Sequence, residues 1–411
     1  IQYTTYFILA HLEKNIEKIK RLLLDKAYCV NATAQLLQKA QEKIDIPRDF
    51  IEILVELLEK PYPKKAQHHA IQIIALVAET EADFEWPVLK VLIEIFLARE
   101  DEILLKNALL ALGHYAKRQA NIFFRKPILA ILVELIEQNR LAHNASFFLQ
   151  SIIAYASIEE KPEDIEELMA KLIVNFEFHG SEFEASVRKN LALVLLHSVD
   201  KGLMVELEQL EALIALSETL NDMELTPFFL NAIGIWLRRL EKVHLEERAV
   251  VIVLSYFNTE HVEIANLASS ILSDYFTKTE QDVPENFIKA IVQQGEDPER
   301  RRNILLLLSD VSRKKCKFPE EALDFLALVL QEESFELSFE ALHILKKIAR
   351  VAPPTKKLLN ALQFLLQGEE EEPVDLSLEV LRRLIKHHHC AHELTEDTCL
   401  QLAKIAAIKG L

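Results

Sequence analysis

The chain has 411 residues, and its 47 Lys and Arg against 64 Asp and Glu give a formal net charge of −17. Its seven glycines are far below the usual share of roughly 7%, which leaves little material for tight hairpins or Gly-rich phosphate loops. The acidic balance argues against a general nucleic-acid binder, because neutralising phosphates needs positive charge.

Cysteine usage and hydropathy place the chain among cytoplasmic proteins without a membrane span. Four cysteines in a chain of this length do not make a disulfide framework, so we expect reduced thiols in the cytoplasm. No apolar run approaches the roughly 18 residues that cross a bilayer. The chain begins with Ile1 rather than Met, and residues 6–10 are apolar. We therefore expect a fragment of a longer chain, with further helices before Ile1.

A repeat with a period of 36 to 41 residues runs along the chain, interrupted once. Each repeat has an anchor, a small or apolar residue that is followed four positions later by another apolar residue, so each anchor predicts an amphipathic helix. The one longer interval, 46 residues before Leu191, predicts an insertion near residues 175–186. The anchors are Ala32, Ala70, Ala108, Ala145, Leu191, Ala232, Ala268, Ile304, Ala341 and Ser377.

A second apolar segment lies between successive anchors, and several of these segments open near a proline. Proline suits the first turn of a helix and disfavours its interior. Each repeat is thus predicted to be a helix A, a short turn and a helix B that carries the anchor. The segments are residues 50–58, 88–97, 128–136, 165–173 and 322–330, and the prolines are Pro47, Pro87, Pro127, Pro162, Pro284, Pro319 and Pro354.

The sequence Ala-x-x-Ala-Leu-Gly from Ala108 to Gly113 resembles the second helix of a HEAT or armadillo repeat. Val187 and Arg188, followed by Leu191, resemble the opening of the same helix. The resemblance covers nearly the whole chain. It implies an all-α fold, a right-handed α-solenoid of about ten stacked helix pairs that forms a single domain over residues 1–411. Families of this kind serve as transport receptors, adaptors, scaffolds and pathogen effectors.

Asparagine recurs one position before the anchor, and we call these residues the asparagine column. Asparagine is a mediocre helix former, so its recurrence inside helices needs a cause. One hypothesis is a row of amides that contacts the backbone of an extended peptide. The other is a ladder that bonds the adjacent repeat and holds the stack in register. The column consists of Asn31, Asn107, Asn144, Asn190, Asn231 and Asn303, with His69 in the second repeat.

Cations gather late in the B helices of the last repeats, and we call them the cationic ridge. One interpretation is a docking strip for an acidic peptide, a phosphorylated segment or an anionic lipid head group. The alternative is that cations near helix C-termini complement the helix dipole. The ridge comprises Arg238, Arg239, Lys242, Arg313, Lys314, Lys315, Lys346, Lys347, Arg350, Arg382, Arg383, Lys386 and His387.

Histidines and cysteines near the C-terminal side form a weak metal candidate. His388 and His392 are four residues apart, and Cys390 and Cys399 complete a set of ligands that zinc accepts. The spacing matches no familiar zinc module, so a solvated helix end is the favoured interpretation and we expect no metal or other cofactor. Motifs of hydrolases and phosphate-binding loops are absent, and we expect no enzyme.

The sequence predicts a non-catalytic scaffold or adaptor that binds a partner protein or an extended peptide along the surface formed by its B helices. Three alternatives stay open. The first is a phosphoinositide- or membrane-docking solenoid, such as a trafficking adaptor or a pathogen effector, that uses the cationic ridge. The others are a nucleic-acid-binding solenoid and a metal-dependent enzyme centred on the His387 to Cys399 cluster.

Overall fold

The computed structural model describes residues 16–42, 46–80, 85–157, 165–204, 206–314, 316–331, 334–368, 371–396, 398–400 and 402–403. The chain divides into two compact units, which we call unit 1 (Ile1–Val205) and unit 2 (Glu206–Leu411). Throughout the described residues the regular structure is helical, apart from one isolated bridge between Val243 and Thr279. The predicted all-α fold is confirmed.

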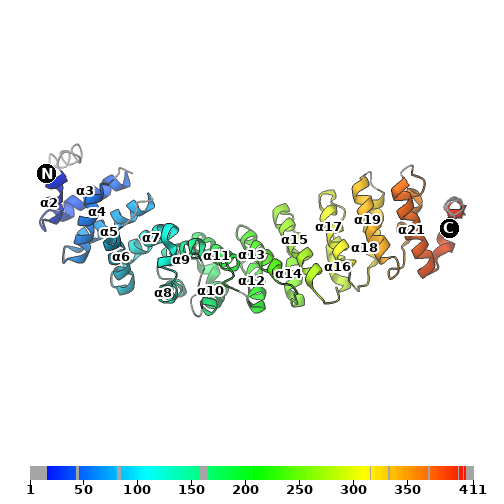
Figure 1. The fold of residues 1–411 in the computed structure, drawn as a ribbon, viewed down its shortest axis with the longest axis horizontal. Coiled ribbons are helices and arrows are strands. Elements are labelled where there is room, and N and C mark those ends of the chain that lie inside the picture. The colour runs from blue at the N-terminus through cyan, green and yellow to red at the C-terminus, as the bar shows by residue number, and fades with distance from the viewer. Residues whose placement is uncertain are drawn as a thin grey trace. The chain divides into compact units, whose positions relative to one another are not determined.

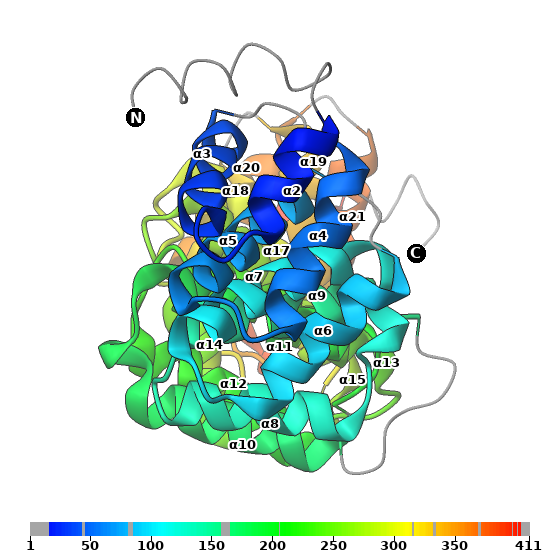
Figure 2. The ribbon, with the colours of Figure 1, turned by 90° about the vertical axis from the view of Figure 1, so that its left-hand side faces the viewer.

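Unit 1 is a stack of helix pairs in which even-numbered helices are A helices and odd-numbered helices are B helices (Figure 1). Figure 2 shows α2, α4 and α6 on one side of this unit and α3, α5 and α7 on the other. The helices are α2 (Ile16–Leu24), α3 (Cys29–Gln41), α4 (Arg48–Glu59), α5 (Lys64–Glu79), α6 (Trp86–Ala98), α7 (Glu102–Gln119), α8 (Lys126–Glu137), α9 (Ala142–Tyr155), α10 (Ile165–His179) and α11 (Ala185–Asp200). Short 3-10 turns are η1 (Ala120–Ile122) and η2 (Gly180–Glu182).

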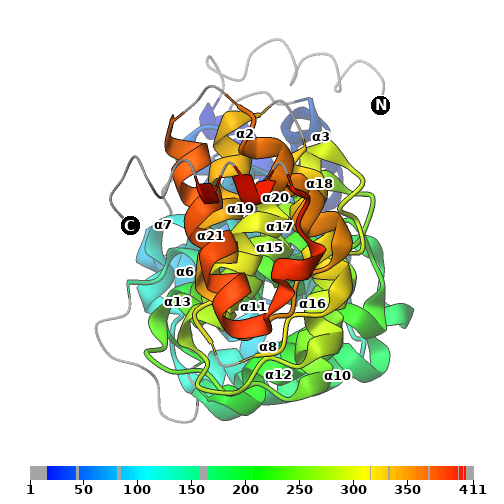
Figure 3. The ribbon, with the colours of Figure 1, turned by 90° about the vertical axis from the view of Figure 1, so that its right-hand side faces the viewer.

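Unit 2 repeats the same arrangement, with α19 and α21 beside each other in Figure 3. Its helices are α12 (Leu207–Leu220), α13 (Thr226–Arg239), α14 (Glu247–Phe257), α15 (Val262–Lys278), α16 (Glu285–Val292), α17 (Pro298–Val311), α18 (Glu320–Leu330), α19 (Phe335–Ile348), α20 (Lys356–Leu365) and α21 (Glu371–His388), followed by the 3-10 turn η3 (Cys390–Glu393).

The sequence anchors lie on the B helices, and all of them are buried. In unit 1 each B helix packs on the next from α3 to α11, and in unit 2 the same holds from α13 to α21. Small anchors permit this close approach. Gly113 shows how tight it is, because a Cβ added there would lie 2.7 Å from the ring of Phe147 on the next B helix. Close packing between the two B helices therefore favours glycine at this position of the Ala-Leu-Gly motif.

Proline marks the start of several helices, as predicted. Pro87 and Pro127 stand in the first turns of α6 and α8. Pro47, Pro284 and Pro319 precede α4, α16 and α18 directly. A missing N–H costs nothing there, because the first helical N–H groups have no partner within the helix.

The predicted insertion near residues 175–186 is a continuation of helix rather than a separate loop. Its first residues belong to α10, η2 follows, and α11 has begun by Ala185. Phe176 and Phe183 are buried, whereas Phe178 is 73% exposed. The longer repeat interval is thus partly accommodated by a 15-residue A helix.

Candidate functional site

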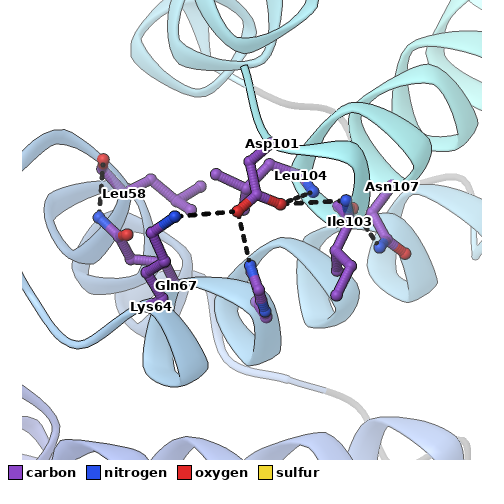
Figure 4. A network of polar contacts seen from close by, with 8 residues as sticks. Leu58, Lys64, Gln67, Asp101, Ile103, Leu104 and Asn107 are labelled. Carbon is purple, nitrogen blue, oxygen red and sulfur yellow. Dashed lines mark hydrogen bonds and ion pairs between the residues drawn. The ribbon is translucent and has the colours of Figure 1, made fainter. Parts of the chain in front are cut away.

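Polar contacts between neighbouring repeats decide which surface side chains remain available, and Asp101 shows such a contact in unit 1 (Figure 4). One carboxylate oxygen accepts from the N–H groups of Ile103 and Leu104 at 3.0 and 3.1 Å, which caps α7. The other lies 3.1 Å from His68 Nε2 and 3.9 Å from Lys64 Nζ on the preceding B helix, α5.

These contacts also govern the ionisation of Asp101. Its partial burial opposes the charged form, but the hydrogen bonds from His68 and from the Leu104 N–H outweigh burial and hold the pKa of Asp101 below its ordinary value. The sequence analysis missed this residue. Its signal was an Asp directly before Glu102 and a periodic apolar run, the pattern of a helix N-cap.

Some members of the asparagine column bond the preceding B helix. Asn190 Nδ2 donates to Ser146 Oγ at 3.2 Å, from α11 to α9. Asn303 Nδ2 donates to Asn266 Oδ1 at 2.7 Å, from α17 to α15. In the second repeat, His69 Nδ1 lies 3.1 Å from Thr33 Oγ1. At these positions the column forms rungs between successive repeats.

The other members do not share one environment. Asn107 donates to the carbonyl oxygen of Ile103 in its own helix at 2.8 Å. Asn144 is 5% exposed, and Asn31 and Asn231 are exposed. The column is therefore not a uniform row of amides facing a ligand.

Cations late in B helices or directly after them, of which Lys314 and Arg383 belong to the cationic ridge, cap the C-terminal ends of preceding B helices. Lys278, at the end of α15, donates to the carbonyl oxygens of Leu237 at 2.6 Å and Arg238 at 2.8 Å, in the last turn of α13. The carbonyls of a last helical turn lack partners in their own helix and carry the negative end of the dipole. The same arrangement recurs from Lys314 to Thr277 (3.3 Å) and Thr279 (2.7 Å), from Arg383 to Lys346 (2.7 Å), and in unit 1 from Lys201 to Ala156.

Carboxylates on B helices or directly after them pair with ridge cations. Glu379 accepts from both Lys346 and Arg383 at 2.7 Å, and these cations hold its pKa below the ordinary value despite some desolvation. Arg313 lies 3.6 Å from the buried Asp310. Other pairs are Arg238 with Asp274 (3.8 Å) and Lys242 with Glu280 (2.6 Å).

The remaining ridge cations concentrate where α19 and α21 end. Arg350, Arg382 and Lys386 are exposed. Desolvation, followed by the charges of Lys386 and Arg350, lowers the pKa of His387. Arg350, Arg382 and Lys386 place exposed positive charge at this part of unit 2, although the chain is strongly acidic.

Lys347 of the cationic ridge is exposed, and its Nζ lies 3.5 Å from Ser309 Oγ on α17. Desolvation, followed by the charge of Arg313, lowers the pKa of Lys347. Lys315 lies outside the described residues.

The sequence analysis did not identify a row of aromatic rings on α19. The rings of Phe335 and Phe339 are stacked with centroids 5.9 Å apart, and Phe339 meets His343 edge to face at 4.6 Å. We call these three residues the aromatic stripe. Phe335 is 44% exposed and His343 is exposed. Their spacing of four residues could have revealed the stripe, because it places large rings on one face of a helix.

A groove of about 920 Å³ lies on the A-helix side of unit 2. Its floor includes Phe325 and Leu328 of α18. Lys289 and Lys357 stand beside it, but each is paired with a carboxylate, Glu321 at 3.3 Å or Asp324 at 2.6 Å. The charges lining this groove are thus largely compensated.

The metal candidate is not assembled. His388 Nε2 lies 3.1 Å from the carbonyl oxygen of Ala349, Cys390 is buried and Cys399 is exposed. Within the part of the chain that the structure describes, no group of three or more His, Cys, Asp or Glu residues, His392 included, could hold a metal ion. Among the described helices, none combines the length and apolar character needed to cross a bilayer.

Comparison with known proteins gives structural similarity without sequence similarity. No protein-family model and no curated protein matches the chain. An engineered protein is similar at 18% identity and a TM-score of 0.48, over 90% of this chain and 98% of that one. Karyopherin Kap121p bound to the extreme C-terminus of the phosphatase Cdc14p is similar at 13% identity and a TM-score of 0.43, over 90% of this chain and 41% of that one.

A further similar structure comes from a report on a phosphorylation switch in the interaction between cadherin and β-catenin, at 12% identity and a TM-score of 0.42, over 93% of this chain and 96% of that one. The chain spans about two fifths of the karyopherin chain. Its own helix pairs, with buried anchors and B helices packed on B helices, make it a HEAT/armadillo-like helical repeat protein.

Proposed function

We propose that the chain is a non-catalytic scaffold that binds an extended, acidic segment of a partner protein on the B-helix side of unit 2. One observation carries this proposal. Arg350, Arg382 and Lys386 stay exposed where α19 and α21 end, whereas neighbouring ridge cations are used for capping or ion pairs. A local positive surface on a chain of charge −17 suits a partner of opposite charge.

The chemistry of the exposed residues fits this partner. Arginine binds carboxylates through two parallel hydrogen bonds, and several modest contacts along an extended segment add up to useful affinity. Because the groups are exposed, we expect binding to weaken with salt, as the Debye length falls from about 10 Å at 0.1 M to about 3 Å at 1 M. The proposal includes no reaction.

A cytoplasmic location accompanies the proposal. Cys29, Cys316, Cys390 and Cys399 all lie within the described residues and form no disulfide there. Burial raises the pKa of the Cys316 thiol to about 11, which suits a structural cysteine rather than a reactive one. Reduced cysteines are the rule in reducing compartments.

The proposal can be tested by fluorescence anisotropy with a labelled 16-residue peptide that contains a run of Glu, against a peptide in which Gln replaces each Glu. We expect the Glu peptide alone to bind, and the double variant Arg350→Glu, Lys386→Glu to weaken its binding at least tenfold. The matched control is Arg125→Glu, Lys356→Glu. It makes the same charge change at starts of A helices, where an acid suits the dipole.

The outcomes separate the candidate partners. Equal binding of the Glu and Gln peptides, or equal loss in both double variants, would refute the acidic-segment proposal. Binding only of a phosphoserine version of the peptide would also refute it, in favour of a phosphorylated partner. Vesicles with and without anionic lipid form a further arm, and capture by anionic vesicles alone would favour the membrane-docking alternative.

A further inference from the structure

We infer, resting on the proposed function, that the bound segment also carries a bulky apolar side chain that sits on the aromatic stripe, four to six residues from its nearest acidic residue. The stripe comprises Phe335, Phe339 and His343 on α19. It lies on the same helix that leads to Arg350.

The stripe and the cations share one face of α19. At 100° per residue, Phe335, Phe339, His343 and Lys346 fall within an arc of about 80°. Arg350 follows two residues after the helix ends at Ile348. The exposed face of α19 thus changes from aromatic to cationic along its length, which is the complement of a segment that is apolar at one point and acidic at another.

A neighbouring helix adds apolar surface beside the stripe. Leu306 of α17 is 48% exposed, and α17 packs against α19. Leu306 and His343 occupy the same position in their repeats, two residues after the anchors Ile304 and Ala341. Aromatic rings in contact at a spacing of four residues do stabilise a helix by themselves, but an exposed stripe next to an exposed leucine offers an apolar surface that a ligand can cover.

The spacing in the partner follows from the helix geometry. Arg350 follows two residues after the end of α19 at Ile348. Phe335 and Ile348 are about 20 Å apart along the helix axis at 1.5 Å per residue, and Phe339 and Ile348 are about 14 Å apart. An extended segment advances about 3.3 Å per residue, so these distances correspond to about four to six residues.

Charge decides the chemistry of the occupant. Two acids on these B helices are already engaged, Glu379 by Lys346 and Arg383, and Asp310 by Arg313. A purely apolar ligand would leave Arg350 and Lys386 without counter-ions, whereas a segment with both features satisfies the stripe and the cations together. An acidic segment with an apolar anchor is therefore the better fit than an apolar helix or a second copy of this acidic chain.

The test uses four labelled peptides on the full chain, all built on a Ser/Thr background. The first has one Leu, a four-residue spacer and four Glu; the second has Ser in place of Leu; the third has Leu directly beside the Glu run; the fourth has Gln in place of Glu. We expect the first to bind about tenfold more tightly than the second and third, since covering a leucine side chain on the stripe removes apolar surface from water.

Variants of the chain locate the effect. Phe335→Ala, Phe339→Ala should reduce binding of the first peptide to that of the second. Phe364→Ala, which removes another exposed aromatic ring (62% exposed) from an A helix of the same unit, should leave binding unchanged. The comparison of peptides on the unaltered chain needs no variant, so it remains decisive even where a variant folds poorly.

Failure of the inference and failure of the proposed function give different results. If the first three peptides bind equally and only the Gln peptide does not, the apolar anchor is refuted while the acidic-segment proposal stands. If the Gln peptide binds as tightly as the first, or if no peptide binds, the acidic-segment proposal falls and the inference falls with it.

Discussion

Replacing Lys278 by methionine should measure what one capping contact between repeats contributes to stability. The substitution keeps the apolar stem of the side chain and removes the ammonium group that bonds Leu237 and Arg238 at 2.6 and 2.8 Å. Hydrogen bonds that involve a charged group contribute about 1.5–3 kcal/mol. Because this lysine is only half-buried, water can partly replace it at the two carbonyls, and we expect a loss of about 1–2 kcal/mol.

The assay is urea unfolding monitored by the fluorescence of Trp236, which is 3% exposed and lies in α13 beside the capped carbonyls. A Trp86→Phe background removes the other tryptophan, which is 62% exposed. Lys356→Met is the matched control, because this lysine stands at the start of α20, where a cation opposes the dipole. A Lys278→Met effect within about 0.3 kcal/mol of the control would refute the capping argument, as independent surface changes already differ by that much.

Three further predictions concern stability, each to be measured by urea unfolding. Asp101→Ala should cost about 1–2 kcal/mol through loss of the helix cap, and Asp101→Asn should recover part of it; equal costs would contradict the cap. Asn144→Ala should cost about 1–3 kcal/mol because the amide is buried, whereas the exposed Asn231→Ala should cost under about 0.5 kcal/mol; equal effects would contradict the assigned burial. Stability should fall as pH drops below about 6.5, because burial lowers the pKa of three histidines and the unfolded chain then binds more protons; a flat profile from pH 7.5 to 5.5, or one unchanged when these histidines become Gln, would overturn this. The histidines are His69, His114 and His197.

The repeat architecture was predictable because its signal is periodic and dense. Apolar residues at helical spacing must face a core, and a small residue such as Ala108 marks where two helices approach. Prolines such as Pro87 then fix the helix starts. The insertion was harder to predict, because an apolar, Phe-rich segment such as the one around Phe176 fits both a loop and a longer helix until its packing is known.

Polar contacts were less predictable because they depend on the partner helix. The sequence identified Asn190 and Asn303 as unusual but could not tell a rung from a ligand contact, since both use the same amide. The dipole interpretation of the ridge concerned the carbonyls at the end of a cation's own helix, whereas Lys314 and Arg383 bond carbonyls of the preceding B helix. The capping role of Asp101 could have been predicted from the sequence, because an Asp directly before a periodic apolar run is the pattern of a helix N-cap.

The capping contacts and two of the asparagine contacts between repeats have a common direction, whereas the ion pairs do not. Asn190, Asn303, Lys278, Lys314 and Arg383 each donate to a B helix that comes earlier in the chain. Removing a repeat from the C-terminal side of such a run leaves helix-end carbonyl oxygens on the preceding repeat without their partners. Removing a repeat from the N-terminal side leaves only side-chain donors without partners, and water hydrogen-bonds to these exposed donors readily. Within unit 2 we therefore expect removal or local unfolding of a repeat on the N-terminal side to cost less stability than removal of one on the C-terminal side.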